Sequence, residues 1–199
     1  MTRSRADEIL DRVRDRLVDL PGRGAVGPRI IAIDGPAGSG KTTLAEELRA
    51  ALLARDGIDA PVVGVDDFLG WRDLDPERVS WWPRWEREIL GPLAAGQDLV
   101  WGRRDWWRDP EGESVLPEPA RAAWAPIAIL EGVSVSRAVA ADRLALAVWV
   151  EAPPEVRFAR GIERDGEPNR EHWRTWQAME SAFFAADGTR ARADLVLET

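Results

Sequence analysis

Short apolar runs alternate with amphipathic stretches along most of the chain. The runs are rich in β-branched and aliphatic residues, which is typical of buried parallel strands, and they cover 29–34, 61–65, 125–131, 143–151 and 193–197. Between them, apolar residues recur at helical spacing, which predicts helices at 1–20, 41–55, about 84–95, 134–140, 154–164 and 171–186. This alternation predicts the α/β class, with a three-layer α/β/α fold and a five-stranded parallel sheet.

One long segment interrupts the alternation. From about 66 to 124 the chain is polar and aromatic; 99–107 could be extended, and 109–119 has the Pro, Glu and Gly content of a loop. No internal repeat, low-complexity tract or linker marks a second domain. We therefore expect one domain, 1–199, with an insert at about 66–124 on top of the sheet.

Composition excludes several classes of protein. A hydrophobic fraction of 45% in 199 residues suffices for one sizeable core, and a net charge of -8 disfavours nucleic acid as a partner. The absence of cysteine excludes disulfides and thiolate metal sites and fits a cytoplasmic location. Neither a signal peptide nor a membrane span is expected, because charges interrupt the apolar positions of 1–20 and no run of about 18 apolar residues occurs.

The segment between the first strand and the following helix carries phosphate-binding chemistry. Gly35-Pro36-Ala37-Gly38-Ser39-Gly40-Lys41-Thr42 matches the pattern G-x-x-x-x-G-K-[ST] in the required context. The glycines let backbone N–H groups surround a polyphosphate, Lys41 neutralises the outer phosphates, and Thr42 offers a hydroxyl to Mg²⁺. We therefore expect a P-loop NTPase fold with ATP and Mg²⁺ as cofactors. The expected nucleotide contacts are Gly35, Pro36, Ala37, Gly38, Ser39, Gly40, Lys41, Thr42 and Thr43.

Lys41 is also the only lysine of the chain, and every other Lys or Arg position holds arginine. A compact ammonium that survives in such a sequence indicates a site where a planar guanidinium would not serve. The same fact excludes the N-K-x-D segment with which GTPases read guanine. Since no signature of a helicase or a transporter ATPase is present either, the small-molecule kinases remain.

Two carboxylates follow predicted strands. Asp66 comes directly after the strand at 61–65, and Glu131 ends the apolar run 125–131. Both should lie beside the P-loop, because ligands collect at the carboxyl ends of strands in open α/β sheets. Asp66 could accept the proton of an attacking hydroxyl, and Glu131 resembles the carboxylate of a Walker B strand. A turn cap for Asp66 or Asp67, and a solvated strand end for Glu131, are the alternatives.

Three segments resemble the uridine kinase and phosphoribulokinase group of P-loop kinases. They are Val65-Asp66-Asp67-Phe68-Leu69, Ile129-Leu130-Glu131-Gly132-Val133 and Arg157 to Arg170. The resemblance spans most of the chain after the first helix and implies ATP-dependent phosphorylation of a small-molecule hydroxyl, with a nucleoside-like acceptor. It implies Asp66 as general base, and Thr42, Glu131 and Asp66 around Mg²⁺. Leu69 stands where uridine kinases commonly have tyrosine, so pantothenate-like alcohols, sugar phosphates and hydroxylated antibiotics stay open as acceptors.

Arginines supply the cations that phosphoryl transfer needs. Arg157, Arg160 and Arg164 recur at helical intervals before 165–170, a loop that resembles the mobile lid of this kinase group; we place the lid at about 157–171. An ordinary solvated arginine face is the alternative. The catalytic candidates are Lys41, Asp66, Arg160 and Arg164. The candidates for substrate contacts are Asp66, Asp67, Phe68, Arg103, Arg104 and Arg170.

Tryptophan is abundant, with 11 in the chain and many of them in the insert. The flat rings could wall a pocket for the small-molecule acceptor, or they could simply pack a small subdomain. Two other functions stay open. One is a nucleoside monophosphate kinase in which Arg72, Arg84, Arg103 or Arg104 binds an acceptor phosphate; the other is a nucleotide-binding regulatory protein that transfers nothing. A homodimer is compatible with each of them.

Overall fold

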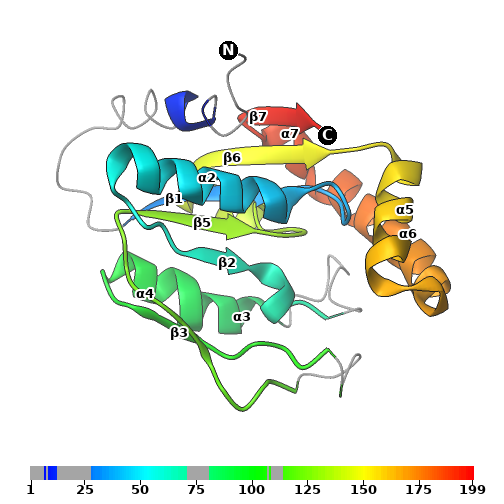
Figure 1. The fold of residues 1–199 in the computed structure, drawn as a ribbon, viewed down its shortest axis with the longest axis horizontal. Helices are drawn as coiled ribbons and strands as arrows, with labels where there is room; N and C mark the ends of the chain where they lie inside the picture. The colour runs from blue at the N-terminus through cyan, green and yellow to red at the C-terminus, as the bar shows by residue number, and fades with distance from the viewer. Residues whose placement is uncertain (1–6, 8, 13–27, 71–80, 107, 109–113) are drawn as a thin grey trace.

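The computed structural model describes Asp7, residues 9–12, 28–70, 81–106, Arg108 and residues 114–199. A parallel sheet of five strands forms its centre, in the order β2-β5-β1-β6-β7 (Figure 1). The strands are β1 (Arg29–Asp34), β2 (Val62–Gly64), β5 (Ile127–Glu131), β6 (Leu144–Glu151) and β7 (Leu195–Glu198). The five predicted strands and the predicted α/β class are confirmed.

Helices cover both faces of the sheet. In β1, Ile31 and Ile33 belong to the core cluster under α2 (Lys41–Asp56), whereas Ile30 and Ala32 belong to the cluster under α3 (Trp82–Trp85) and α6 (Arg170–Asp187). Successive side chains of a strand point to opposite faces, so an uninterrupted apolar strand is what a sheet buried on both sides requires. The three-layer arrangement is confirmed.

The insert contains a helix with an irregular centre. Between α3 and α4 (Gly91–Ala94) lies a π-helical turn, Glu86–Leu90, in which the Gly91 N–H bonds to the Glu86 carbonyl five residues earlier. Pro92 explains the irregularity, because it has no N–H to offer the Glu88 carbonyl and its ring would press on that oxygen in a regular α-helix. The predicted helix at about 84–95 is therefore present, with a local widening before Pro92.

The insert also contains a short ribbon, one strand of which lies within the stretch 99–107 that could be extended. β3 (Leu99–Trp101) pairs antiparallel with β4 (Ala120–Ala122), a ribbon for which the sequence shows no clear period-2 pattern. The bounds of the insert, its role and the single-domain organisation stay predictions. Among the described residues, no helix has both the length and the apolar composition needed to cross a membrane.

One predicted helix differs from the structure, and another is described only in part. The helix expected at 134–140 is wrong; residues 134–137 form turns, and a 3₁₀ segment runs over Ala138–Arg143. Most of the helix expected at 1–20 lies outside the described residues, although Asp7 and residues 9–12 are helical and Asp7 forms an ion pair with Arg55 of α2.

α5 (Pro154–Asp165) packs against α6 through a glycine. A Cβ on Gly161 would lie 2.3 Å from Cε2 of the Trp173 indole, which is itself buried. The two backbones can therefore approach only because position 161 has no side chain. α7 (Thr189–Arg192) follows α6 and leads into β7.

Gly161→Ala should destabilise the protein although alanine is the better helix former. Helix propensity alone would raise stability by about 1 kcal/mol, but the added methyl must push the Trp173 ring aside at a cost of about 1–3 kcal/mol. Denaturant unfolding should therefore show lower stability for this variant. The exposed Ala159→Gly serves as a control for propensity. A Gly161→Ala protein more stable than wild type would contradict the packing described here.

Candidate active site

The register of the sheet brings three acidic residues to one edge. Glu131, the last residue of β5, pairs with Ile33 of β1 on one side and with Gly64 of β2 on the other. Asp34 ends β1 and Asp66 follows β2 by two residues. All three strands are parallel, so their carboxyl ends share one edge of the sheet, beside the P-loop and the start of α2.

Two glycines give the P-loop its shape. Gly35 and Gly38 have φ angles of 141° and 78°, in the region that favours glycine. A Cβ on Gly35 would lie 2.0 Å from the Val150 carbonyl oxygen, and one on Gly38 would lie 2.6 Å from that of Arg157. The loop therefore fits against β6 and α5 only with glycine at these positions. The Lys41 Nζ donates a hydrogen bond of 3.0 Å to the Pro36 carbonyl, so the ammonium lies against the loop.

Asp34 anchors this loop, and the sequence reasoning missed it. Its carboxylate is fully buried and accepts hydrogen bonds from the Gly35 N–H (2.7 Å), the Ser134 N–H (2.9 Å), the Ser136 N–H (2.8 Å) and the Ser136 hydroxyl (2.8 Å). Burial raises the pKa of Asp34, and the donors from Ser136 and Gly35 oppose that rise. One side chain thus joins the start of the P-loop to the segment behind Glu131. In the sequence, the sign of this role is a single acidic residue at the end of an apolar strand.

The side chains of Thr42 and Glu131, the two candidate metal ligands, lie in contact. The Thr42 hydroxyl donates a hydrogen bond of 3.3 Å to Glu131 Oε1, and Glu131 is only 9% exposed. Burial and the neighbouring Asp66 raise the pKa of Glu131 to about 7, against the opposing effect of Lys41 and Thr42. Hard oxygen ligands of this kind suit Mg²⁺, which commonly takes one or two protein ligands and completes its shell with phosphate and water. Among the described residues, no group of three or more His, Cys, Asp or Glu forms a separate metal cluster.

The segment after β2 divides its predicted site residues. Asp66 is exposed and lines the cleft, whereas Asp67 turns to the insert, where its carboxylate accepts a 2.7 Å hydrogen bond from Trp101 Nε1. Burial raises the pKa of Asp67. Phe68 is 5% exposed and meets Trp85 edge to face, with ring centroids 4.9 Å apart. Of these three residues, only Asp66 lines the cleft.

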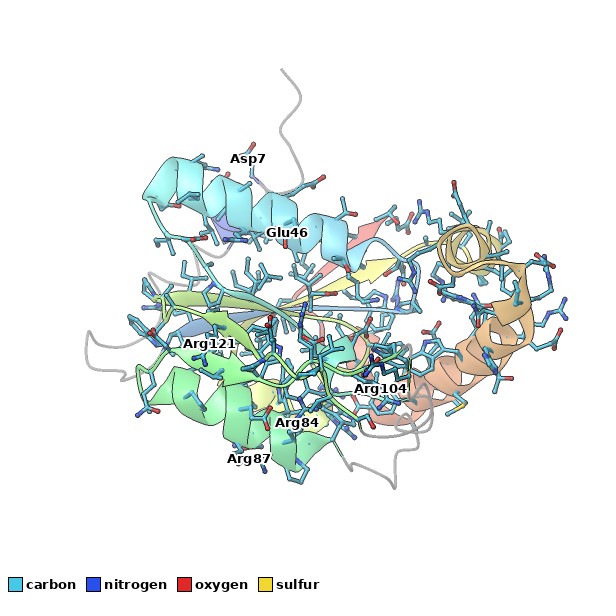
Figure 2. The ribbon with its side chains drawn as sticks, turned by 60° about the horizontal axis from the view of Figure 1, so that its bottom comes forward. Asp7, Glu46, Arg84, Arg87, Arg104 and Arg121 are labelled. Carbon is cyan, nitrogen blue, oxygen red and sulfur yellow. The ribbon has the colours of Figure 1, made fainter. Side chains whose placement is uncertain are left out.

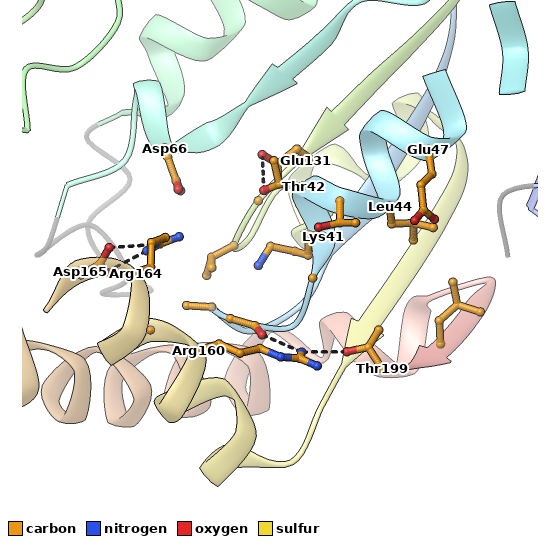
Figure 3. Close-up of a pocket in the computed structure, with 18 of the residues that line it drawn as sticks. Lys41, Thr42, Leu44, Glu47, Asp66, Glu131, Arg160, Arg164, Asp165 and Thr199 are labelled. Carbon is orange, nitrogen blue, oxygen red and sulfur yellow. Dashed lines mark hydrogen bonds and ion pairs between the residues drawn. The ribbon is translucent and has the colours of Figure 1, made fainter. Parts of the chain in front are cut away.

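The cleft has a volume of about 1780 Å³ and continues along α2 as far as Arg55. At its P-loop end, Lys41, Asp66 and Arg164 extend into the same space from three different elements (Figure 3). Arg164 bonds both carboxylate oxygens of Asp165, at 2.7 and 2.9 Å. Arg160 donates to the Gly38 carbonyl at 3.2 Å and to the Thr199 hydroxyl at 3.2 Å. The cations from α5 therefore reach the P-loop side and the open side of the cleft.

Apolar and aromatic side chains also line the cleft. Of the predicted site residues, Ala37, Gly38, Gly40, Lys41, Thr42, Thr43, Asp66, Glu131, Arg160 and Arg164 line the cleft. The lining residues that the sequence reasoning did not assign include Leu69, Trp106, Val133, Asn169, His172, Trp173 and Trp176. Trp106 Nε1 donates a 3.0 Å hydrogen bond to the Asp66 carbonyl, which ties the insert to the candidate base. Helical spacing of the two tryptophans in α6 was the signal that could have indicated this part of the lining.

The remaining arginine candidates lie outside the cleft lining. Figure 2 labels Arg84 and Arg104. Arg84 bonds the carbonyls of Asp67 and Gly102 and the Glu88 carboxylate, and the Arg104 guanidinium lies over the Trp106 ring, 4.4 Å from its centroid. Arg103 is exposed. Arg170 pairs with Glu167, and Arg72 falls outside the described residues. Substrate contacts from Arg103, Arg104 and Arg170 stay predictions, as do those from Asp67 and Phe68.

No protein-family model matches the chain, and no curated protein matches its sequence. Solved structures do resemble it. One is a protein of Silicibacter sp. TM1040 provisionally described as a fructose transport system kinase, with a TM-score of 0.73, 22% identity and 98% of both chains covered. Another, from Bacillus stearothermophilus and described as a candidate uridine kinase, has a TM-score of 0.62 and 20% identity over 96% of this chain and 99% of that one. D-glycerate 3-kinase of Cryptococcus neoformans var. grubii gives 0.51 and 16% over 97% and 70%. The chain therefore shares the fold of these structures, and the expected three-layer α/β/α fold is confirmed.

Glu131→Gln should change how stability depends on pH. The folded-state pKa of about 7 exceeds the ordinary 4.5, so the folded chain holds this proton more tightly than the unfolded chain. That stabilisation is complete below about pH 4.5 and is lost as the pH rises through about 7. In EDTA, urea unfolding should therefore show a growing advantage of Glu131→Gln over wild type from about pH 5 to pH 8, reaching about 3 kcal/mol. A difference that stays constant over this range would contradict the assignment.

Asp34→Ala should be among the most destabilising single changes near the site. It leaves donors of Gly35, Ser134 and Ser136 buried without an acceptor, at about 1–3 kcal/mol for each unsatisfied group. Chemical denaturation should show a loss of at least about 3 kcal/mol. Asp98→Ala is the control, since it removes a single exposed bond to the Trp124 N–H and should cost about 1 kcal/mol. Equal losses in the two variants would refute the anchoring role of Asp34.

Proposed function

We propose that the protein is an ATP-dependent kinase that transfers the outer phosphoryl group of ATP to a hydroxyl of a small molecule. One observation carries the proposal. Ala37, Gly38, Gly40 and Lys41 of the P-loop, the oxygen pair of Thr42 and Glu131, and the exposed carboxylate of Asp66 line one cleft together with Arg160 and Arg164 of α5. The P-loop kinase fold of the neighbours supports it.

Each group has a role that its position supports. The N–H groups of the P-loop and Lys41 hold the triphosphate, and Lys41 exchanges the Pro36 carbonyl for phosphate oxygen when ATP enters. Thr42 and Glu131 would hold Mg²⁺, which would supply positive charge to offset that of the phosphates. Asp66 takes the hydroxyl proton while the acceptor oxygen forms its bond to the outer phosphorus and the bond to the bridging oxygen of ADP breaks. Arg160 and Arg164 stabilise the charge on the transferred group.

A nucleoside-like, uncharged acceptor suits this cleft. Leu69, Val133, Trp106 and Trp176 offer apolar and flat surfaces near Asp66, against which a ring can stack. In the part of the cleft that the structure describes, the arginines and lysine of the lining are Lys41, Arg55, Arg160 and Arg164, of which Arg55 is distant along α2. An acceptor phosphate would therefore compete with ATP for the same cations, which favours a nucleoside over a nucleoside monophosphate.

The reading as a monophosphate kinase is weaker for a second reason. Arg84 is engaged by Asp67, Gly102 and Glu88, and Arg103 and Arg104 do not line the cleft.

A cytoplasmic location and independence from nucleic acid and membranes belong to the same proposal, supported by the missing cysteine and the net negative charge.

Replacing each of two adjacent aspartates by asparagine tests the proposal. Asp66→Asn removes the base and should lower kcat by roughly 10²- to 10⁴-fold, while the Kd of MgATP stays within about threefold of wild type. Asp67→Asn is the matched control, because its carboxylate bonds Trp101; it should change kcat by less than about tenfold. The measurements are ADP formation over a panel of nucleosides, nucleoside monophosphates, pantothenate and sugar phosphates, and calorimetric ATP binding.

Two outcomes would contradict the proposal. If no acceptor raises ADP formation above the rate without acceptor while ATP binds, a regulatory nucleotide-binding protein becomes the better account. If Asp67→Asn loses as much turnover as Asp66→Asn, the assignment of the base is wrong.

A further inference from the structure

A charged residue interrupts the buried stripe of α6. The buried residues of this helix are Trp173, Trp176, Glu180 and Phe183, at helical spacing along one face. Three of them are aromatic, and the fourth is a glutamate with 1% exposure. A carboxylate at an apolar position is costly to bury unless specific partners compensate it.

The partners of Glu180 belong to the P-loop and to α5. Its Oε2 accepts a 2.8 Å hydrogen bond from the Ala37 N–H, and its Oε1 lies 2.6 Å from Nη1 of Arg157. The same Nη1 donates to the Ala37 carbonyl at 3.3 Å, and the Arg157 Nε donates to the Ala152 carbonyl at 3.1 Å. An ion pair contributed by two helices therefore holds both the N–H and the C=O of one P-loop residue, 143 positions from Glu180.

Stability alone does not explain this arrangement. A buried ion pair is often no more stabilising than two apolar residues of similar volume, because both charges lose their hydration. Arg157 is 9% exposed, so both members of the pair are desolvated. An apolar pair would fill the space between α5 and α6 but would leave the Ala37 N–H and C=O without these partners. The pair thus holds the two peptide groups that flank Ala37, which an apolar core would leave free to turn.

We propose that Glu180 and Arg157 are positioning residues that set the two peptide groups flanking Ala37, and through them the P-loop, in the orientation that receives the triphosphate. The proposal rests on the proposed function only in taking a nucleoside triphosphate as the ligand. It also gives the two helices a shared fixed point: α5 continues from Arg157 to Arg160 and Arg164, and α6 carries Trp176 one turn before Glu180. This ion pair therefore also sets where Arg160, Arg164 and Trp176 lie relative to the P-loop.

Two double variants separate positioning from structure. Arg157→Met with Glu180→Met removes both charges while keeping apolar volume, and Arg157→Met with Glu180→Gln restores only an oxygen acceptor for the Ala37 N–H. We expect the first to raise the Kd of MgATP roughly 10- to 100-fold at little change in Tm, and the second to recover most of that loss. Calorimetry with MgATP, well below each Tm, provides the readout. The exposed pair Arg174 and Glu171, both changed to Met, is the control and should bind MgATP like wild type.

A second substitution covers the case in which the apolar pair does not fold. Glu180→Asp keeps the charge beside Arg157 but shortens the side chain by one methylene, so it should weaken the bond to Ala37 and raise the Kd of MgATP several-fold. A Met pair that folds and binds MgATP like wild type overturns the proposal, and so does wild-type affinity in Glu180→Asp.

These outcomes are distinct from a failure of the kinase proposal. If wild type binds MgATP but phosphorylates no acceptor, the kinase proposal falls while the positioning role is still decided by the variants. If wild type does not bind MgATP at all, both proposals fall.

Discussion

The site depends on the hydrogen bonds that the buried Asp34 carboxylate accepts. It accepts hydrogen bonds from the first N–H of the P-loop and from the segment that follows β5, so it joins two loops that the sheet alone would only bring near each other. Glu131 ends β5, directly before the second of these loops. One buried side chain thus fixes the distance between the P-loop and Glu131, the candidate metal ligand. Arg157 and Glu180 hold the same cradle from the side of α5 and α6.

The cationic side chains that line the cleft form hydrogen bonds to other groups of the protein. Lys41 bonds the Pro36 carbonyl, Arg160 bonds the Gly38 carbonyl, and Arg164 bonds Asp165. For Lys41 and Arg160 the partner is a neutral carbonyl, which a phosphate oxygen can replace because a charge-assisted bond to phosphate is stronger. Glu131, by contrast, has a raised pKa because it is buried beside Asp66, and a divalent cation would remove that penalty. Within the proposed function, binding of MgATP therefore provides partners of opposite charge for both the cationic side chains and the carboxylates of the cleft.

The sequence predicts those parts of the molecule that short-range patterns encode. The five strands follow from apolar runs, and the P-loop follows from a local motif whose glycines and lysine act within eight positions. Short-range patterns could not predict the roles of Asp34 and Glu180 or the burial of Phe68. These depend on partners elsewhere in the chain; Ser134, for example, is 100 positions from Asp34. An acid in an apolar strand and an acid in an apolar helical stripe were visible, but only the fold shows which donors surround them. The turn at Glu86–Leu90 could have been anticipated from Pro92, whereas the pairing of β3 with β4 left no comparable signal.

Phosphorus NMR of the reaction products tests the central claim most directly. Wild-type protein and Lys41→Ala would each be incubated with MgATP and a series of uncharged ring-bearing alcohols, alongside their phosphorylated counterparts. The account predicts that wild type alone converts ATP to ADP with a new phosphomonoester signal on an uncharged acceptor. ATP that stays intact in the presence of every acceptor, or that yields only inorganic phosphate, would contradict it.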